Sequence, residues 1–194
     1  LTLALFEKAT DSMLKLPKYL RLSFNLSPAD VIEPHVVKAL IETTRQKGIS
    51  PNRIIFEISE NVLHDHLEQA EKMLNQLSDF GFTIALDDFG GRISNFNHLH
   101  QLPIDVVKLD SELICDLRFS TQSRILVQKI VELAQGLGLR VVAQGISSSD
   151  HLHVLEGLGC QYYQGFHFAR PMSHQKLVNL LHTQDGQLGK QGVA

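Results

Sequence analysis

Six short apolar segments, separated by stretches of helical periodicity, are the feature that most constrains the fold. They are rich in β-branched and aromatic residues, which is typical of parallel strands covered on both faces. We expect strands at Arg21–Ser27, Arg53–Ser59, Thr83–Phe89, Val106–Asp110, Arg140–Ile146 and Tyr162–Phe168. Because a strand–helix unit recurs at this spacing, the sequence predicts an α/β fold with a parallel sheet and right-handed crossovers.

Three of the intervening stretches carry a clear apolar face with a period of 3.6 residues. They span Pro34–Lys47, Leu67–Phe80 and Arg124–Leu137, and each is followed by a glycine that can end a helix. In the third helix the pattern predicts a buried face made of Ile125, Leu126, Ile130, Leu133 and Ala134.

Polar residues at the strand ends favour a barrel over an open sheet. Every predicted strand has one at or near its end: Asn25, Glu57, Asp87 with Asp88, Lys108, Gln144 and Gln164. A (β/α)₈ barrel gathers all carboxyl ends at one mouth, whereas an open sheet concentrates its site near one switch point. Eight strand–helix units take about 250 residues. This chain has 194, so we expect a TIM-like barrel of which about six units are visible.

Composition excludes some classes of function. The formal net charge of −3 argues against a binder of DNA or RNA polymers. Cys115 and Cys160 have no metal-ligand spacing, so we expect buried free thiols and a reducing, cytoplasmic location. No apolar run reaches the roughly 20 residues that span a bilayer. The chain begins at Leu1, and we expect it to be a domain of a larger, multidomain or membrane-attached protein.

The carboxylates at the strand ends indicate a cation site. Glu57 lies within IIFEIS and Asp87 within IALDDF, where an unpaired carboxylate would be costly. Carboxylate and amide oxygens are ligands for Mg²⁺, Mn²⁺ or Ca²⁺, and adjacent aspartates could hold two ions for attack on a phosphate ester. Taken singly, the residues have simpler interpretations. Asn25 could cap a helix, Glu57 could form a salt bridge, and Lys108 could be solvated or paired with Asp87.

Six ordered blocks resemble the EAL-domain family over nearly the whole chain. They are SFNLSP (23–28), FEISEN (56–61), ALDDFG (85–90), KLD (108–110), VVAQG (141–145) and QGFHFARP (164–171). The resemblance implies a modified (β/α)₈ barrel and a cyclic di-GMP phosphodiesterase that uses two Mg²⁺ or Mn²⁺ ions. It also implies metal ligation by Asn25, Glu57 and Asp87, with Asp88 serving the second ion. Lys108 would lie near the attacking water, and Gln164 beside the site.

The chain departs from the family pattern at positions that carry the chemistry. The family's general-base glutamate is Gln144 here, and a second glutamate is Ser147. An amide cannot accept a proton at neutral pH. The loop at 91–96 reads GRISNF, and the Glu-Ala-Leu strand is absent from this chain. We therefore expect a degenerate member with no intact catalytic set and a vestigial or weak metal site.

These observations predict an EAL-type barrel domain over residues 1–182, incomplete at its N-terminus, and a disordered tail over 183–194. We expect a non-catalytic receptor for cyclic di-GMP that signals to a protein partner, either alone or as a homodimer. Its ligand-binding residues would be Lys108, Gln144, Gln164 and Phe166, and weak Mg²⁺ or Mn²⁺ binding would not be required. An active phosphodiesterase in the complete protein and a nucleotide-free scaffold remain alternatives.

Overall fold

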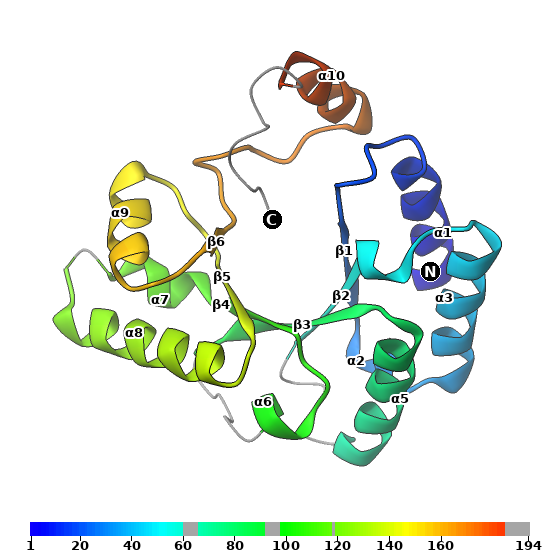
Figure 1. The fold of residues 1–194 in the computed structure, drawn as a ribbon, viewed down its shortest axis with the longest axis horizontal. Helices are drawn as coiled ribbons and strands as arrows, with labels where there is room; N and C mark the ends of the chain where they lie inside the picture. The colour runs from blue at the N-terminus through cyan, green and yellow to red at the C-terminus, as the bar shows by residue number, and fades with distance from the viewer. Residues whose placement is uncertain (60–65, 92–97, 118, 185–194) are drawn as a thin grey trace.

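The computed structural model describes residues 1–59, 66–91, 98–117 and 119–184. Within these ranges six strands form one parallel sheet in the order β1-β2-β3-β4-β5-β6. The strands are β1 (Leu22–Leu26), β2 (Ile54–Ser59), β3 (Thr83–Phe89), β4 (Val106–Leu109), β5 (Arg140–Ala143) and β6 (Tyr162–Tyr163). Figure 1 shows them at the centre with the helices outside. The predicted α/β class and parallel direction are confirmed, and the sequential strand order is the one that a barrel requires.

The sixth strand is much shorter than the predicted Tyr162–Phe168. Pairing with the neighbouring segment continues through Gln164, whose N–H donates to the carbonyl of Ala143. The backbone then turns at Gly165, since the N–H of Phe168 donates back to the Gly165 carbonyl. Phe166 therefore lies in a turn rather than on a strand. The turn bond forms beside one further backbone bond to the neighbouring segment, from the N–H of His167 to the carbonyl of Ile146.

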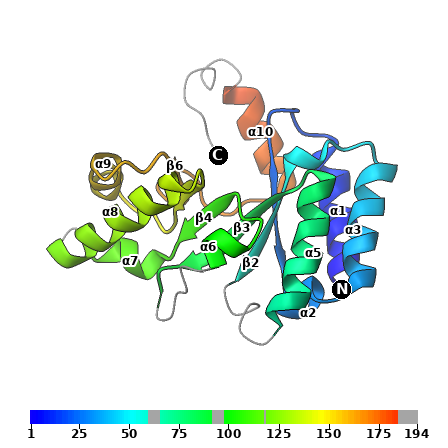
Figure 2. The ribbon, with the colours of Figure 1, turned by 60° about the horizontal axis from the view of Figure 1, so that its bottom comes forward.

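The described helices include the three that the periodicity predicts, although part of the buried face of one was misassigned. They are α1 (Thr2–Met13), α2 (Pro28–Val31), α3 (Pro34–Gln46), η1 (Pro51–Arg53), α5 (Leu67–Phe80), α6 (His98–Gln101), α7 (Ser111–Cys115), α8 (Thr121–Gly136), α9 (Ser149–Gly157) and α10 (His174–Gln184). Figures 1 and 2 place α1, α3 and α5 side by side next to β1 and β2. α10 extends two residues beyond the expected domain end at 182, and residues 185–194 lie outside the described ranges.

In α8 the buried face overlaps the predicted one only at Ile130 and Ala134. The side chains against the sheet are Val127, Ile130, Val131 and Ala134. Ile125, Leu126 and Leu133 are instead 53%, 44% and 42% exposed. The helix carries more apolar residues than one stripe can bury, so periodicity alone does not select the stripe that faces β5.

The core lies between the sheet and the surrounding helices. In β2, Ile54, Phe56 and Ile58 are fully buried, and the Phe56 ring lies 5.7 Å from Phe6 of α1 and 4.8 Å from Phe82, between centroids. The intervening residues of β2, Ile55 and Glu57, line a cavity on the other face. This alternation follows from the two-residue period of a strand, and it places polar groups on the concave side of the sheet.

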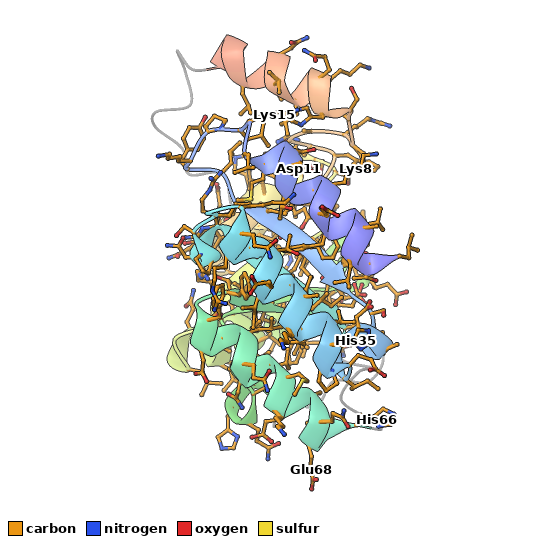
Figure 3. The ribbon with its side chains drawn as sticks, turned by 90° about the vertical axis from the view of Figure 1, so that its right-hand side faces the viewer. Lys8, Asp11, Lys15, His35, His66 and Glu68 are labelled. Carbon is orange, nitrogen blue, oxygen red and sulfur yellow. The ribbon has the colours of Figure 1, made fainter. Side chains whose placement is uncertain are left out.

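Charged side chains lie on the outer side of the helical layer of α1, α3 and α5. Charges of both signs share this face (Figure 3), which carries Lys8, Asp11, Lys15, His35 and Glu68.

Both cysteines are free, but Cys115 is exposed and only Cys160 is buried, which corrects the prediction of two buried thiols. No helix in the described ranges is long and apolar enough to cross a membrane.

Candidate functional site

The concave side of the sheet bounds a cavity of about 460 Å³. Alternate residues of each strand line it, because every second side chain points to the same face. The lining residues are Arg21, Ser23, Asn25, Ile55, Glu57, Ala85, Val106, Lys108, Val142, Tyr163 and Gln164. Four of the predicted site residues, Asn25, Glu57, Lys108 and Gln164, are thus brought together.

Lys108 lies at the centre of a buried ion-pair network. Its Nζ is 2.7 Å from Oε2 of Glu57 and 3.2 Å from Oδ1 of Asp87. Lys108 is 4% exposed and Glu57 7%, so water screens these charges poorly. The solvated interpretation of Lys108 is wrong, and the salt-bridge interpretations of Glu57 and Lys108 are confirmed. Both carboxylates have an ammonium partner, which offsets the cost of burying them.

Gln144, the first residue after β5, also contacts the Asp87 carboxylate. Its Nε2 donates a hydrogen bond of 2.9 Å to Oδ1 of Asp87. Oδ1 of Asp87 therefore has two donors, an ammonium from β4 and an amide from the end of β5. The arrangement joins the ends of three neighbouring strands, β3, β4 and β5.

The pairing of β3 with β4 is irregular at Asp87 and Asp88. The register shifts between Leu86 and Phe89, so that Asp87 and Asp88 together oppose Lys108. Such a bulge re-aims a side chain, and Asp88 adopts a positive φ of 55°. Desolvation raises the pKa of the Asp88 carboxyl, and the charges of Asp87 and Asp110 raise that pKa further. Asp88 thus lines a second cavity, not the concave one.

This second cavity measures about 400 Å³ and adjoins the first at Gln164. Its lining residues are Asp88, Ser111, Gln144, Gly145, Ile146, Ser147, Gln164, Gly165 and Phe166. Phe166 is 60% exposed, so it is not a core residue. The guanidinium carbon of Arg170 lies 5.2 Å from the centre of its ring. Phe166 therefore offers a flat apolar surface with a cation beside it.

Two glycines allow the backbone segments around this cavity to approach closely. A Cβ on Gly165 would lie 2.2 Å from the Ile146 carbonyl oxygen. Gly145 has φ +75°, and a Cβ there would lie 2.7 Å from Cβ of Ser111. Both positions thus require the absence of a side chain.

Sequence reasoning missed two residues of this site. Ser111 lines the second cavity and directly follows the KLD block. Arg170, against Phe166, lies inside the QGFHFARP block. Their places beside these blocks were the only signals available, because neither residue type is diagnostic by itself.

The side chains at the mouth do not fit a resident divalent ion in this arrangement. Among the described residues, no group of three His, Cys, Asp or Glu side chains is placed to hold a metal. Glu57 Oε2 and Asp87 Oδ1 contact the Lys108 ammonium. An ion bound to either oxygen would lie next to a positive charge.

Comparison with known proteins identifies the family. The EAL domain family matches residues 1–171. The chain belongs to the EAL domain family. EAL domains are TIM-like barrels, which agrees with the parallel sheet and with the predicted resemblance.

Related proteins are phosphodiesterases and nucleotide-bound enzymes. The cyclic di-GMP phosphodiesterase PA2567 of Pseudomonas aeruginosa is 33% identical over 162 residues, covering 84% of this chain and 28% of that protein. The EAL enzyme Bd1971, solved with cAMP and cyclic di-GMP, superposes with a TM-score of 0.83 at 25% identity, covering 93% of this chain and 49% of the other. BlrP1 of Klebsiella pneumoniae, a calcium and cyclic di-GMP complex, gives 0.80 at 29% identity, covering 89% and 43%.

The match covers only a part of each relative. This chain spans 20%, 21% and 28% of the length of three curated relatives. The EAL domain described here is therefore related to cyclic di-GMP phosphodiesterases through one of their regions.

Proposed function

We propose that this EAL domain is a non-catalytic receptor for cyclic di-GMP. The observation that carries the proposal is the hydrogen bond from Gln144 Nε2 to Asp87 Oδ1. Phosphodiester hydrolysis needs a group that accepts a proton from the attacking water. The amide of Gln144 cannot accept that proton, and here it acts as a donor.

The neighbouring positions supply no evident substitute for the base. Ser147, which stands where the family has a second glutamate, is a hydroxyl with no useful basicity at neutral pH. The two nearest carboxylates, Glu57 and Asp87, already contact the Lys108 ammonium through Oε2 and Oδ1. The residues at positions 144 and 147 and these pairings support the proposal that no catalytic set is intact.

Groups suited to binding are retained. Cyclic di-GMP carries two phosphate charges and two purines, so its site needs donors beside flat apolar surface. The second cavity has Gln164, Gln144 and Ser111 as donors and Phe166 as a surface for stacking. Arg170, beside Phe166, adds a positive charge. A volume of about 400 Å³ lies within the range of small-molecule sites.

Metal is not a requirement of the proposed receptor. Two BlrP1 complexes are named as containing calcium or manganese with cyclic di-GMP, and this relation makes Mg²⁺ or Mn²⁺ relevant to the family. Here we expect weak affinity for either ion, because Lys108 supplies the positive charge at Glu57 and Asp87. Asn25, Glu57, Asp87 and Asp88 would then be vestigial ligands.

The domain would act through other parts of its protein. We propose that it extends to about residue 182, is completed by N-terminal residues, and belongs to a larger cytoplasmic or membrane-attached protein. Ligand binding would favour one of two conformations that differ in their contacts with a protein partner or a second copy.

Isothermal titration calorimetry of the complete domain with cyclic di-GMP tests the proposal. We expect saturable binding in EDTA that changes little when Mg²⁺ is added, with the dinucleotide recovered intact. Absence of binding in both buffers would favour the nucleotide-free scaffold. Recovery of the linear dinucleotide would favour the active phosphodiesterase.

A further inference from the structure

We infer that Gln144 keeps divalent metal ions out of this site, and that the single change Gln144→Glu converts the mouth of the barrel into a metal site. In the native chain two internal donors, the Lys108 ammonium and the Gln144 amide, occupy the place that a cation would take beside Asp87. The inference concerns the protein without nucleotide, so it does not depend on the proposed receptor role.

Two donors from the protein itself already occupy Oδ1 of Asp87. Its Oδ1 accepts from Gln144 Nε2 at 2.9 Å and lies 3.2 Å from Lys108 Nζ. Mg²⁺ binds oxygen at about 2.0–2.1 Å and demands near-octahedral geometry. An ion bound to this oxygen would have to displace at least one of the two donors. Displacing the amide would also leave a half-buried N–H group without its acceptor, which is costly.

The charges of the carboxylates at the mouth of the barrel are balanced by a single ammonium group. Glu57 and Asp87 share the Lys108 ammonium, while Asp88 is aimed at the cavity that Gln144 also lines. Gln144 thus bonds to Asp87 and lines the same cavity as Asp88, but contributes no charge. Its neutrality lets one ammonium suffice for the buried pair.

The substitution changes charge without changing shape. A glutamate at position 144 would place a carboxylate oxygen where Nε2 is now, 2.9 Å from Oδ1 of Asp87. Two ionised oxygens at this distance repel each other strongly when water is scarce. The donor becomes an acceptor, and the end of β5 gains, beside Asp87, an oxygen ligand of the type that Mn²⁺ and Mg²⁺ prefer.

Mn²⁺ binding by the complete domain, measured without nucleotide, tests this inference. Free Mn²⁺ is counted by electron paramagnetic resonance, and the melting temperature is recorded in EDTA and in Mn²⁺ at equal ionic strength. We expect Gln144→Glu to bind Mn²⁺ about tenfold or more tightly than the native domain. We also expect its melting temperature to fall in EDTA and to recover in Mn²⁺, while the native melting temperature is the same in both buffers.

The chain offers a matched control in Gln128→Glu. Gln128 Nε2 also donates to a carboxylate, Oε1 of Glu132, at 3.0 Å, but on the exposed surface of α8. This change adds the same charge and breaks the same kind of hydrogen bond, so it should leave Mn²⁺ affinity at the native value.

Three results would overturn the inference. Native protein that binds Mn²⁺ as tightly as Gln144→Glu would show that the amide excludes nothing. A Gln144→Glu variant with unchanged affinity would show that the introduced carboxylate pairs with Lys108 instead. A variant that unfolds in EDTA and stays unfolded in millimolar Mn²⁺ would show that no site forms. Failure of cyclic di-GMP to bind would affect none of these results.

Discussion

The side-chain amide of Gln144 donates a hydrogen bond of 2.9 Å to Oδ1 of Asp87, which lies 57 residues earlier in the chain. The bond spans the end of β4 and shares its acceptor with the Lys108 ammonium. Gln144 thereby holds the Asp87 carboxylate in place, at a position where the family resemblance predicts a proton-accepting glutamate.

This hydrogen bond predicts that the complete domain does not hydrolyse cyclic di-GMP. Loss of a general base typically lowers a rate by roughly 10²–10⁴-fold. With Mg²⁺ or Mn²⁺ present, chromatography should therefore detect no linear product above a protein-free control, while an active EAL phosphodiesterase assayed in parallel shows turnover. A rate of about 1 s⁻¹ or more would be ordinary enzymatic turnover and would contradict the prediction.

Removing the buried ammonium should strongly destabilise the fold. Lys108→Met leaves Glu57 and Asp87 without their cation, and breaking a buried pair in this way costs roughly 3–5 kcal/mol in the free energy of unfolding. Urea denaturation measures the loss. The control is Lys129→Met, which removes an exposed partner of Glu132 at 2.7 Å and should change little. Equal effects of the two changes would show that burial of Lys108 contributes nothing.

Phe166→Ala should weaken cyclic di-GMP binding without harming the fold. Loss of a base–aromatic stack costs about 1–3 kcal/mol of binding free energy. Because Phe166 is 60% exposed, the melting temperature should hardly change. Phe168→Ala is the control, since Phe168 is 50% exposed and stacks near Tyr163 without lining the second cavity. Equal affinity of both variants and the native domain in calorimetry would remove Phe166 from the site.

Gly165→Ala should distort the wall of the second cavity. The added methyl group would lie 2.2 Å from the Ile146 carbonyl oxygen and 2.3 Å from its nitrogen. Backbone must move to accommodate it, and we expect a loss of at least about 2 kcal/mol in stability. At Gly157, the last residue of α9, a Cβ meets nothing within 4 Å, so Gly157→Ala should be neutral or slightly stabilising. Thermal or urea unfolding of both variants decides the comparison.

Tyr163 should make stability depend on alkaline pH. Desolvation, aided by the charges of Cys160 and Glu156, raises the pKa of Tyr163 to about 12 from 10.0. The unfolded phenol ionises near pH 10 while the folded one keeps its proton, so its contribution to stability is complete below pH 10 and is lost as the pH rises toward 12. Phenolate absorbance near 295 nm should contain a component titrating near 12 that Tyr163→Phe lacks. The variant should also show a shallower fall in melting temperature over this range, and identical curves would contradict the assignment.

Local patterns in the sequence determined the elements and the position of the site. Short β-branched runs predicted six strands in the correct order, because a strand buried on both faces requires a continuous apolar run. The polar residues that end those runs could be assigned to one mouth, since parallel strands place their carboxyl ends together. The replacement of the family's glutamate by Gln144 could also be recognised from the sequence, because it concerns the identity of a single residue.

Tertiary structure decided the contacts between those elements. Sequence left open whether Lys108 was solvated or paired, because its partners come from β2 and β3 and depend on strand register. It placed Phe166 on a strand and assigned Ile125, Leu126 and Leu133 of α8 to the buried face, because hydrogen bonds at Gly165 and packing against the sheet override local periodicity. That Gln144 donates to Asp87 was equally beyond reach, since only the bulge at Asp87–Asp88 and the pairing of β3, β4 and β5 bring these two side chains within 2.9 Å.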